Sequence, residues 1–261
     1  MFPTLIELGP FFLFGMQIGP FILHAYGLFI AAAFLLAISW SMREARARGL
    51  DPDLLSDLGF YIILGSILGA RALYVLINPV YYLNNPQEIL MFWKGGLVFS
   101  GGAILAACLG VFYLRRKRQP LWTWLDALAP GIALGETVGR LGCLAAGCCY
   151  GATCDLPWAI TFTHPESLAP LFVPLHPTQL YHSAAGLICF LVLMVCKKYI
   201  RHSGWLMGIF LTLFGAFRFF IELFRADYRG DFGPISVTQL IALGAIGLGC
   251  AIIYHRRNHV R

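Results

Sequence analysis

Seven stretches of the chain are almost wholly apolar, and each is about long enough to cross a bilayer. A transmembrane helix needs about 20 residues for roughly 30 Å of hydrocarbon. The pattern predicts spans at residues 21–42, 54–77, 97–114, 124–144, 179–196, 204–223 and 236–254. The fourth is the least regular, because Asp126, Pro130 and Glu136 interrupt it. The sequence therefore predicts an all-α integral membrane protein, with about seven transmembrane helices in one transmembrane domain over residues 1–261.

The composition supports this class. Hydrophobic residues make up 59% of the chain and charged residues 12%, whereas about a quarter of an average soluble domain is charged. A cleavable signal peptide is not expected, because the first residues lack basic side chains and the apolar segment from Phe21 is long enough to span.

Basic residues predict the orientation. Most of the 19 lysines and arginines follow the first, third, fifth and seventh spans. The positive-inside rule makes that side cytoplasmic, so we expect a periplasmic N-terminus and a cytoplasmic C-terminus. The net charge of +6 then mainly reflects the orientation in the membrane, and the basic residues also attract anionic lipid headgroups. We expect no nucleic-acid binding, because each basic cluster is short and abuts a span.

Three arginines, Arg71, Arg140 and Arg218, fall inside predicted spans. A charged side chain in a bilayer costs a few kcal/mol, and such residues usually face a bundle interior or a water-filled cavity. Together they favour a pocket that holds an anion. The longest loop, residues 145–178, joins the outer ends of two spans and contains no lysine or arginine. Because loops often carry function, we expect this outer-side loop to hold part of the site.

Five segments carry a family resemblance, in order along nearly the whole chain. They are His24-Ala25-Tyr26-Gly27; Gly95-Gly96-Leu97-Val98-Phe99-Ser100-Gly101-Gly102; Gly139-Arg140-Leu141-Gly142 with Gly147 and Tyr150-Gly151; His176-Pro177-Thr178-Gln179-Leu180-Tyr181; and Gly215-Ala216-Phe217-Arg218 with Glu222 and Phe224-Arg225. On these segments the chain resembles the prolipoprotein diacylglyceryl transferases, enzymes of the bacterial cytoplasmic (inner) membrane.

The resemblance implies a transferase acting in the first step of lipoprotein maturation. The diacylglyceryl group of phosphatidylglycerol would move to the thiol of a lipobox cysteine in the signal peptide of a preprolipoprotein, releasing glycerol 1-phosphate. The active site would face the outer side of the membrane. The resemblance implies no metal, nucleotide or redox cofactor. Guanidinium groups suit the binding of lipid phosphate, because they stay charged and donate in pairs.

The resemblance gives Arg140 and Arg218 catalytic roles at the phosphate. An arginine that snorkels to the outer interface is the structural alternative for Arg140. Arg218, Glu222 and Arg225 are spaced at i, i+4 and i+7, so they share one helical face. Glu222 and Arg225 are substrate-binding candidates, and a neutralised structural ion pair is the alternative. Arg71 is ambiguous, with Asp57, Glu136 or a backbone carbonyl as its expected partner.

Tyr26 and His24 are further catalytic candidates at the outer end of the first span, where a tyrosine is also ordinary in an aromatic belt. His176, Gln179 and Tyr181 are substrate-binding candidates around the start of the fifth span, with helix capping as the alternative. The remaining substrate-binding candidates follow Arg140 and are Gly142, Cys143, Gly147, Tyr150 and Gly151.

The chain departs from the family pattern at two positions. Ser100 stands where the family usually has a histidine implicated as essential, and a serine hydroxyl is a poor base near pH 7. Ser100 keeps its place among the catalytic candidates, but His24, His176 and His164 are the histidines that could accept the thiol proton instead. Cys143 stands where the family has an asparagine.

Four of the eight cysteines gather after the fourth span: Cys143, Cys148, Cys149 and Cys154. In an oxidising compartment a disulfide from Cys148 or Cys149 to Cys154 is one interpretation. A zinc site and a reactive thiol that carries acyl or glyceryl groups are two others, although the spacing matches no standard zinc motif.

Two other functions are compatible with the sequence. A divergent paralogue could perform another phospholipid-dependent transfer, and a non-enzymatic protein could bind or transport phospholipids with the same arginines. Restoration of lipoprotein modification in cells depleted of the native transferase would separate them from the transferase.

Overall fold

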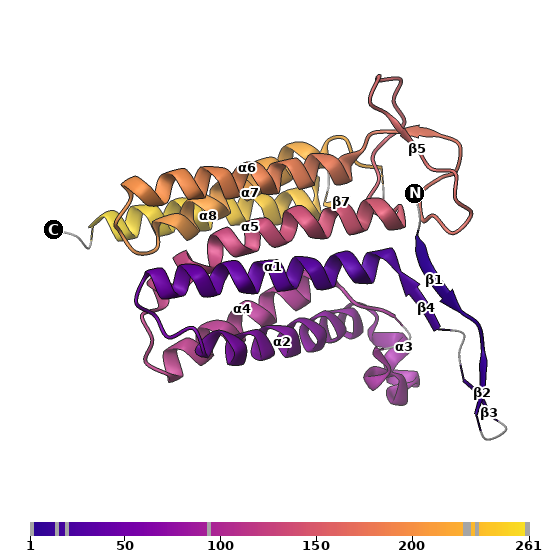
Figure 1. Cartoon of the computed structure of the whole chain (residues 1–261), viewed down its shortest axis with the longest axis horizontal. Helices are drawn as coiled ribbons and strands as arrows, with labels where there is room; N and C mark the ends of the chain where they lie inside the picture. The colour runs from indigo at the N-terminus through magenta and orange to yellow at the C-terminus, as the bar shows by residue number, and fades with distance from the viewer. Residues whose placement is uncertain are drawn as a thin grey trace. The chain divides into compact units, whose positions relative to one another are not determined.

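The computed structural model describes residues 3–13, 16–18, 21–92, 95–226, 231–232 and 235–258. The chain forms two compact units. The larger unit contains Met1–Ser41 and Leu125–Arg261, and the smaller contains Met42–Trp124. Helices α1 (Ala25–Ala47) and α5 (Leu121–Ala146) contribute residues to both units (Figure 1).

The smaller unit is built on two long helices, α2 (Leu54–Ile77) and α4 (Phe99–Arg116). Glycines allow these helices to approach closely: a Cβ added to Gly69 would lie 2.3 Å from the carbonyl oxygen of Gly101. Small residues at such interfaces are typical of helices packed in membranes. A short helix α3 (Pro79–Asn84) and a 3-10 helix η1 (Pro86–Leu90) connect α2 to α4.

The larger unit adds helices α6 (Thr178–Tyr199), α7 (Trp205–Glu222) and α8 (Val237–Asn258). Side chains of α5, α6 and α7 form one buried apolar cluster that includes Ala133, Cys189 and Phe210. Asp126 of α5 is buried and accepts hydrogen bonds from the backbone of Gly204 and Met207, at 2.7 and 2.9 Å. Its charge therefore caps the first turn of α7.

Short antiparallel strand pairs accompany the helices. They are β1 (Thr4–Leu8) with β4 (Phe21–His24), β2 (Phe11–Leu13) with β3 (Met16–Ile18), β5 (Ile160–Thr161) with β6 (Pro174–Leu175), and β7 (Asp231–Phe232) with β8 (Ile235–Ser236). The sequence did not predict them. Because residues 21–24 pair with β1, the first long helix begins at Ala25 and not at residue 21.

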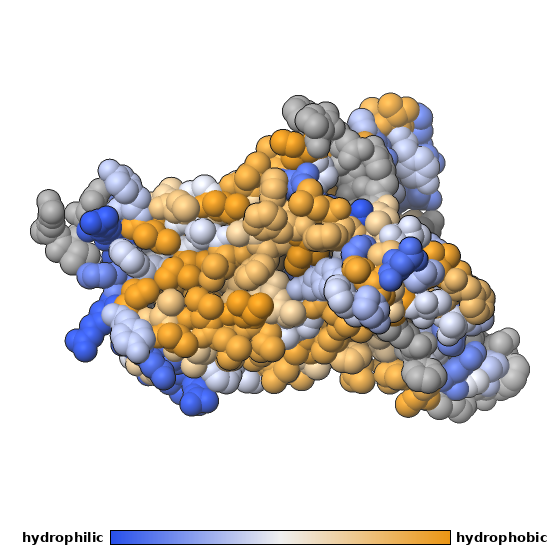
Figure 2. Space-filling model, turned by 90° about the horizontal axis from the view of Figure 1, so that it is seen from above, coloured by the Kyte–Doolittle hydropathy of each residue, from blue (hydrophilic) through white to orange (hydrophobic). Residues whose placement is uncertain are grey.

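Among the described residues, five helices are long and apolar enough to cross a membrane: α1, α2, α6, α7 and α8. Helix α4 ends in Arg115 and Arg116, and α5 carries Asp126, Glu136 and Arg140. Apolar side chains predominate on the face seen in Figure 2, as expected for helices in contact with lipid. The helical membrane class is confirmed, while the seven spans, their orientation and the division into one domain with an outer loop stay predictions.

Candidate functional site

Arg140 lies near the end of α5 and is held by an acidic residue one turn earlier. Its Nε donates to Oε1 of Glu136 at 2.7 Å, and the two side chains are only 14% and 23% exposed. Within the described part of the chain, the two terminal guanidinium nitrogens of Arg140 donate no hydrogen bond. The guanidinium is therefore oriented by Glu136 while its outer edge can still bind an anion.

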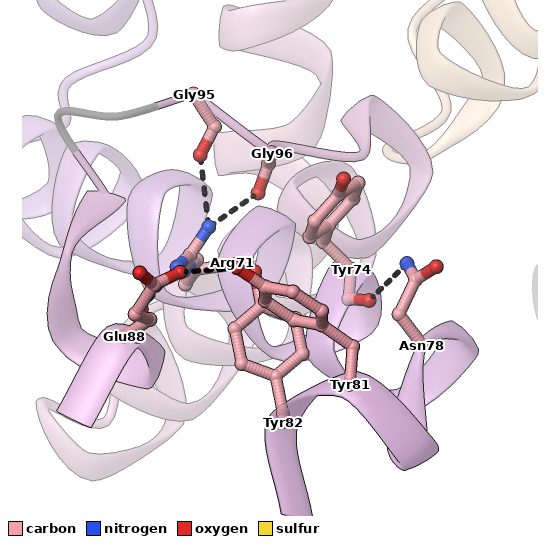
Figure 3. Close-up of a pocket in the computed structure, with 8 residues that line it drawn as sticks. All are labelled: Arg71, Tyr74, Asn78, Tyr81, Tyr82, Glu88, Gly95 and Gly96. Carbon is pink, nitrogen blue, oxygen red and sulfur yellow. Dashed lines mark hydrogen bonds between the residues drawn. The ribbon is translucent and has the colours of Figure 1, made fainter. Parts of the chain in front are cut away.

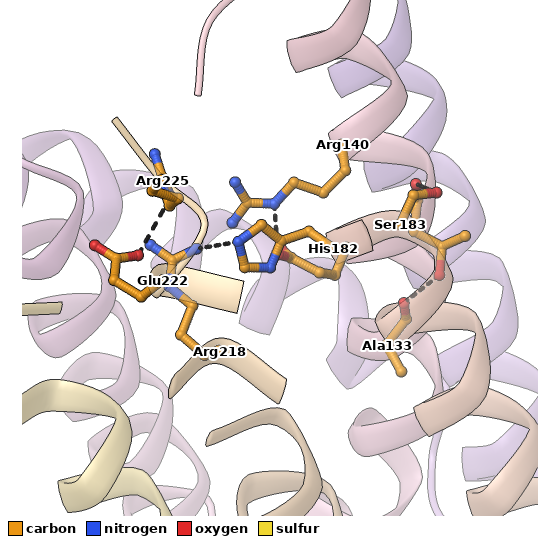
Figure 4. Close-up of polar contacts among 9 residues, drawn as sticks. Ala133, Arg140, His182, Ser183, Arg218, Glu222 and Arg225 are labelled. Atoms are coloured by element: carbon orange, nitrogen blue, oxygen red, sulfur yellow. Dashed lines mark hydrogen bonds and ion pairs between the residues drawn. The ribbon is translucent and has the colours of Figure 1, made fainter. Parts of the chain in front are cut away.

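Arg218 of α7 lies beside His182 of α6. Nη1 of Arg218 is 3.4 Å from Nε2 of His182, whose side chain is buried. Because a guanidinium can only donate, this imidazole nitrogen acts as the acceptor. Figure 4 shows the guanidinium groups of Arg140 and Arg218 beside the His182 ring, and Arg225 is also within electrostatic range of that ring. We refer to Arg140, Arg218 and Arg225 as the cationic cluster.

His182 was missed from the sequence, although a signal for it was present. Gln179, His182, Ser183 and Gly186 are spaced at i, i+3, i+4 and i+7 on α6, and all four are buried. A polar stripe with helical spacing inside an apolar span indicates a face turned to the interior of the bundle.

Arg225 and Glu222 form an ion pair at 3.7 Å, with side chains only 2% and 7% exposed. Helix α7 ends at Glu222, so the predicted helical face does not continue to Arg225. The backbone of Arg225 instead forms a bridge with Gly151. The structure thus pairs Glu222 with Arg225, and a strand-like contact, not a helix turn, positions this arginine.

Gly151 and Gly147 shape the loop that follows α5. A Cβ on Gly151 would lie 2.5 Å from Cβ of His176 and 2.7 Å from the carbonyl oxygen of Phe224, so only glycine fits between these segments. Gly147 has a φ of +77° and would place a Cβ 2.1 Å from Oγ of Ser167. Both glycines therefore allow the backbone of the loop to take a path that a larger residue would block.

Tyr26 sits in the first turn of α1, where a Cβ on Gly142 would lie 3.6 Å from Cδ2 of the Tyr26 ring. The Tyr26 hydroxyl is within electrostatic range of Arg140 and of Cys143, Cys148 and Cys149. Tyr26 thus lies at the site. His24 is an exposed residue at the end of β4, and Ser100 belongs to the smaller unit, as the second residue of α4.

The side chains of His176 and Tyr181 are hydrogen-bonded to each other. Nδ1 of His176 is 3.2 Å from the Tyr181 hydroxyl, which also accepts a hydrogen bond from Nε1 of Trp158 at 2.8 Å. The rings of His176 and Phe224 pack with centroids 5.2 Å apart. These contacts favour the structural interpretation of His176 and Tyr181, and they add Trp158, which the sequence did not single out.

Gln179 holds the cysteine loop against α6. Its Nε2 donates to the carbonyl oxygen of Cys148 at 2.8 Å, and Oγ1 of Thr178 donates to that of Cys149 at 2.7 Å. Gln179 is fully buried, and among the described residues its Oε1 finds no hydrogen-bond partner. A buried amide oxygen without a donor favours a ligand hydroxyl nearby.

None of the eight cysteines, all of which the structure describes, is in a disulfide, so the disulfide considered from the sequence is not formed. The sulfur atoms of Cys143, Cys148 and Cys149 lie within 4.8 Å of one another. Cys154 is not in this group, and its backbone N–H donates to Pro174. Hydrogen bonding with Cys143 and Cys149, and also burial, raises the pKa of the Cys148 thiol, so this thiol is protonated at neutral pH.

Arg71 has a structural role. Its guanidinium donates to the carbonyl oxygens of Ile89 at 2.9 Å, Gly95 at 2.8 Å, Gly96 at 3.2 Å and also Glu88 (Figure 3). It packs 5.2 Å from the ring centroid of Tyr82 and 5.8 Å from that of Tyr74, in a pocket of about 480 Å³. Backbone carbonyls occupy most of its donors, so the anion-binding role considered for Arg71 is not supported.

Comparison with known proteins identifies the family. The family model described as prolipoprotein diacylglyceryl transferase matches residues 14–255. Phosphatidylglycerol--prolipoprotein diacylglyceryl transferase of Trichormus variabilis is 34% identical over 90% of this chain and 86% of its own length. The proteins of the same name from Clostridium tetani (31% identical, 95% of both chains) and Bordetella avium (36%, 93% of this chain and 94% of its own) are similar. The chain belongs to the prolipoprotein diacylglyceryl transferase family.

Proposed function

We propose that this protein transfers the diacylglyceryl group of phosphatidylglycerol to a prolipoprotein, and that the cationic cluster holds the lipid phosphate. The names of the relatives support the reaction and both substrates. The residues of the site come from the geometry of the larger unit alone, because Arg140, Arg218 and Arg225 all belong to it.

The main support for the proposal is the state of the Arg140 guanidinium. Its Nε is fixed by Glu136, and its terminal nitrogens donate to no group in the described residues. Two parallel N–H groups match two oxygens of a phosphate. Arg218, placed by His182, supplies a second cation from a different helix.

The chemistry requires positive charge at this place. The acceptor sulfur attacks a glyceryl carbon, the carbon–oxygen bond to the phosphate breaks, and glycerol 1-phosphate leaves with the bonding electrons. The phosphate gains negative charge as that bond breaks. Fixed cations that meet this charge lower the barrier, and one such donor is worth about 10²–10³ in rate.

The other site residues fall into two groups. Tyr26 and Gln179 are proposed to contact substrate, with the free Oε1 of Gln179 accepting from a headgroup hydroxyl. Gly142, Gly147 and Gly151 are proposed to position the site, because neighbouring atoms leave no room for a side chain at these three residues. Tyr150, His176 and Tyr181 are proposed to support the loop.

The acceptor is proposed to be the lipobox cysteine of a signal peptide in the bacterial cytoplasmic membrane, with the site towards the outer side. The distribution of lysine and arginine supports this orientation, because α6 and α8 have basic last turns while the cationic cluster lies near the opposite end of α6 and α7.

Transfer of labelled diacylglyceryl from phosphatidylglycerol to a lipobox peptide by the purified protein tests the proposal. We expect Arg140→Ala to lower kcat/KM about 10²–10³-fold. Arg140→Lys should retain only part of the wild-type kcat/KM, because lysine lacks the planar guanidinium that donates two parallel hydrogen bonds. Arg116→Ala, an exposed arginine at the end of α4, is the control and should match the wild type.

No transfer by folded protein that binds phosphatidylglycerol would contradict the proposal and point to the divergent paralogue or the lipid-binding protein. Full activity of Arg140→Ala would leave the reaction in place but remove Arg140 from the site.

A further inference from the structure

Three thiols of the larger unit are close enough to share one metal ion. The sulfur atoms of Cys143, Cys148 and Cys149 all lie within 4.8 Å of one another. Zinc binds thiolate at about 2.3 Å, so two sulfurs on one tetrahedral zinc lie about 3.8 Å apart. The cluster therefore needs to contract by only about an ångström to bind zinc.

The fold holds the three sulfurs in place from two sides. Cys143 is in the last turns of α5, and the chain reverses at Gly147, with a φ of +77°, to bring Cys148 back over it. Cys148 then donates its backbone N–H to the carbonyl oxygen of Cys143 at 3.1 Å. Gln179 and Thr178 bind the carbonyls of Cys148 and Cys149 from α6.

The backbone at Cys149 is unusual for a non-glycine residue. Its φ is +60°, a conformation that few residues other than glycine adopt. Such strain is stored mainly at functional sites, where the surroundings fix it. Cys149 has this backbone conformation while its sulfur lies within 4.8 Å of the other two.

The surroundings of the thiols match an anionic metal complex. Arg140 and Tyr26 are both within electrostatic range of the cysteine cluster. Three thiolates and one Zn²⁺ carry a net charge of −1, which the guanidinium of Arg140 offsets. The same guanidinium is proposed to bind the lipid phosphate, so the thiols lie next to the reacting group.

We propose that Cys143, Cys148 and Cys149 bind a zinc ion whose fourth position takes the thiol of the acceptor cysteine. This inference rests on the proposed function, since it names the group that activates the acceptor. Three protein ligands with one open position are typical of catalytic zinc sites, whereas structural sites have four. A thiol that coordinates zinc loses its proton.

The step balances without a redox partner. Binding of the acceptor thiol to zinc forms a zinc–sulfur bond and releases one proton to water. The sulfur then forms a bond to the glyceryl carbon as the carbon–oxygen bond to phosphate breaks, and the electron pair leaves with glycerol 1-phosphate. The product is a neutral thioether, a weaker ligand than thiolate, so it dissociates. This site would replace the base that Ser100 cannot supply.

Metal content of the full-length protein in detergent tests the binding site. We expect about one zinc per chain after incubation with zinc and removal of the excess. Cys148→Ser and Cys149→Ser should each weaken zinc binding at least about tenfold. Cys154→Ser, in the same loop but outside the group, is the matched control and should keep its zinc.

Cobalt(II) in place of zinc gives a readout of the fourth position that does not depend on activity or on the folding of a variant. Thiolate-to-cobalt absorption should appear in the wild type and change when a lipobox peptide is added. The same peptide with serine in place of its cysteine should leave the spectrum unchanged.

Three results would overturn the inference. One is less than about a tenth of a zinc per chain in the wild type. Another is a disulfide among the three cysteines of active protein, detected by mass spectrometry without reduction. The third is transfer that proceeds at an unchanged rate after a chelator has removed all metal, which would leave the proposed function standing. Zinc and a peptide-dependent cobalt spectrum without any lipid transfer would instead contradict the proposed function alone.

Discussion

Nε2 of His182 accepts a hydrogen bond from Nη1 of Arg218 at 3.4 Å, and this contact joins α6 to α7 inside the cationic cluster. A buried imidazole thereby contacts the guanidinium of Arg218 and contributes to its position. Figure 4 shows this contact next to Arg140 and the Arg225–Glu222 pair, and Arg140 in turn donates to Glu136. Each arginine of the cluster therefore has a polar partner that fixes it.

His182→Ala should lower kcat/KM for transfer about tenfold to a hundredfold. The loss of a hydrogen bond to a charged group costs about 1.5–3 kcal/mol, and Arg218 would lose the contact that His182 provides. Steady-state transfer kinetics would measure the change. Ser183→Ala, which removes the neighbouring bond to the carbonyl oxygen of Thr137, is the control and should retain activity. Wild-type kinetics for His182→Ala would contradict the role of His182.

Glu136→Ala should lower kcat while leaving the KM for phosphatidylglycerol unchanged or lower. Arg140 would lose the acceptor of its Nε but would also be less neutralised, so phosphate binding persists while the orientation for the transition state is lost. Glu136→Gln keeps an acceptor oxygen, and its kcat should lie between those of the wild type and Glu136→Ala. A raised KM with unchanged kcat would show that Glu136 acts on lipid binding instead.

Arg71→Met should loosen the segment after α3 with no direct effect on phosphate binding. It removes the donors to the part-buried carbonyls of Glu88, Ile89, Gly95 and Gly96, and a hydrogen bond to a charged group contributes about 1.5–3 kcal/mol. Hydrogen–deuterium exchange should rise in residues 86–92. Unchanged exchange there, together with weaker binding of phosphatidylglycerol, would return Arg71 to the lipid site.

Gly151→Ala should destabilise the protein by about 1–3 kcal/mol, because the new methyl group overlaps His176 and Phe224 in a packed region. Thermal unfolding in detergent would measure this, and transfer should fall with it. Gly244→Ala in α8 is the matched control: nothing lies within 4 Å of its Cβ, and alanine favours a helix by up to about 1 kcal/mol. Equal stability of the two variants would contradict the close packing.

Helix positions could be predicted well from the sequence, because apolar runs of about 20 residues have few alternatives. The second predicted span, residues 54–77, coincides with α2, and α5 continues through Pro130 despite its interruptions. The strand pair β1–β4 and the short helices α3 and η1 were not predicted. Their residues carry no period of their own, and their pairing depends on segments distant in the chain.

The candidate site was predicted in part. Arg140, Arg218, Glu222 and Arg225 were singled out from charge in apolar segments and from family resemblance, and the structure brings these side chains together (Figure 4). The partner of each was less predictable. The signal for His182 was the spacing of buried polar residues along α6 and not a motif around the histidine, and Arg71 could not be assigned because its partners are backbone carbonyls.

The sequence alone determined the membrane class, the positions of the long helices and the family, because hydropathy and motif order are properties of the linear chain. Only the tertiary structure decided which buried charges meet. It placed His182 against Arg218, paired Arg71 of α2 with backbone carbonyls between α3 and α4, and brought three of four neighbouring cysteines together. The reason is physical: a charge inside a membrane must find a partner, but side chains on several helices could serve, and only packing selects among them.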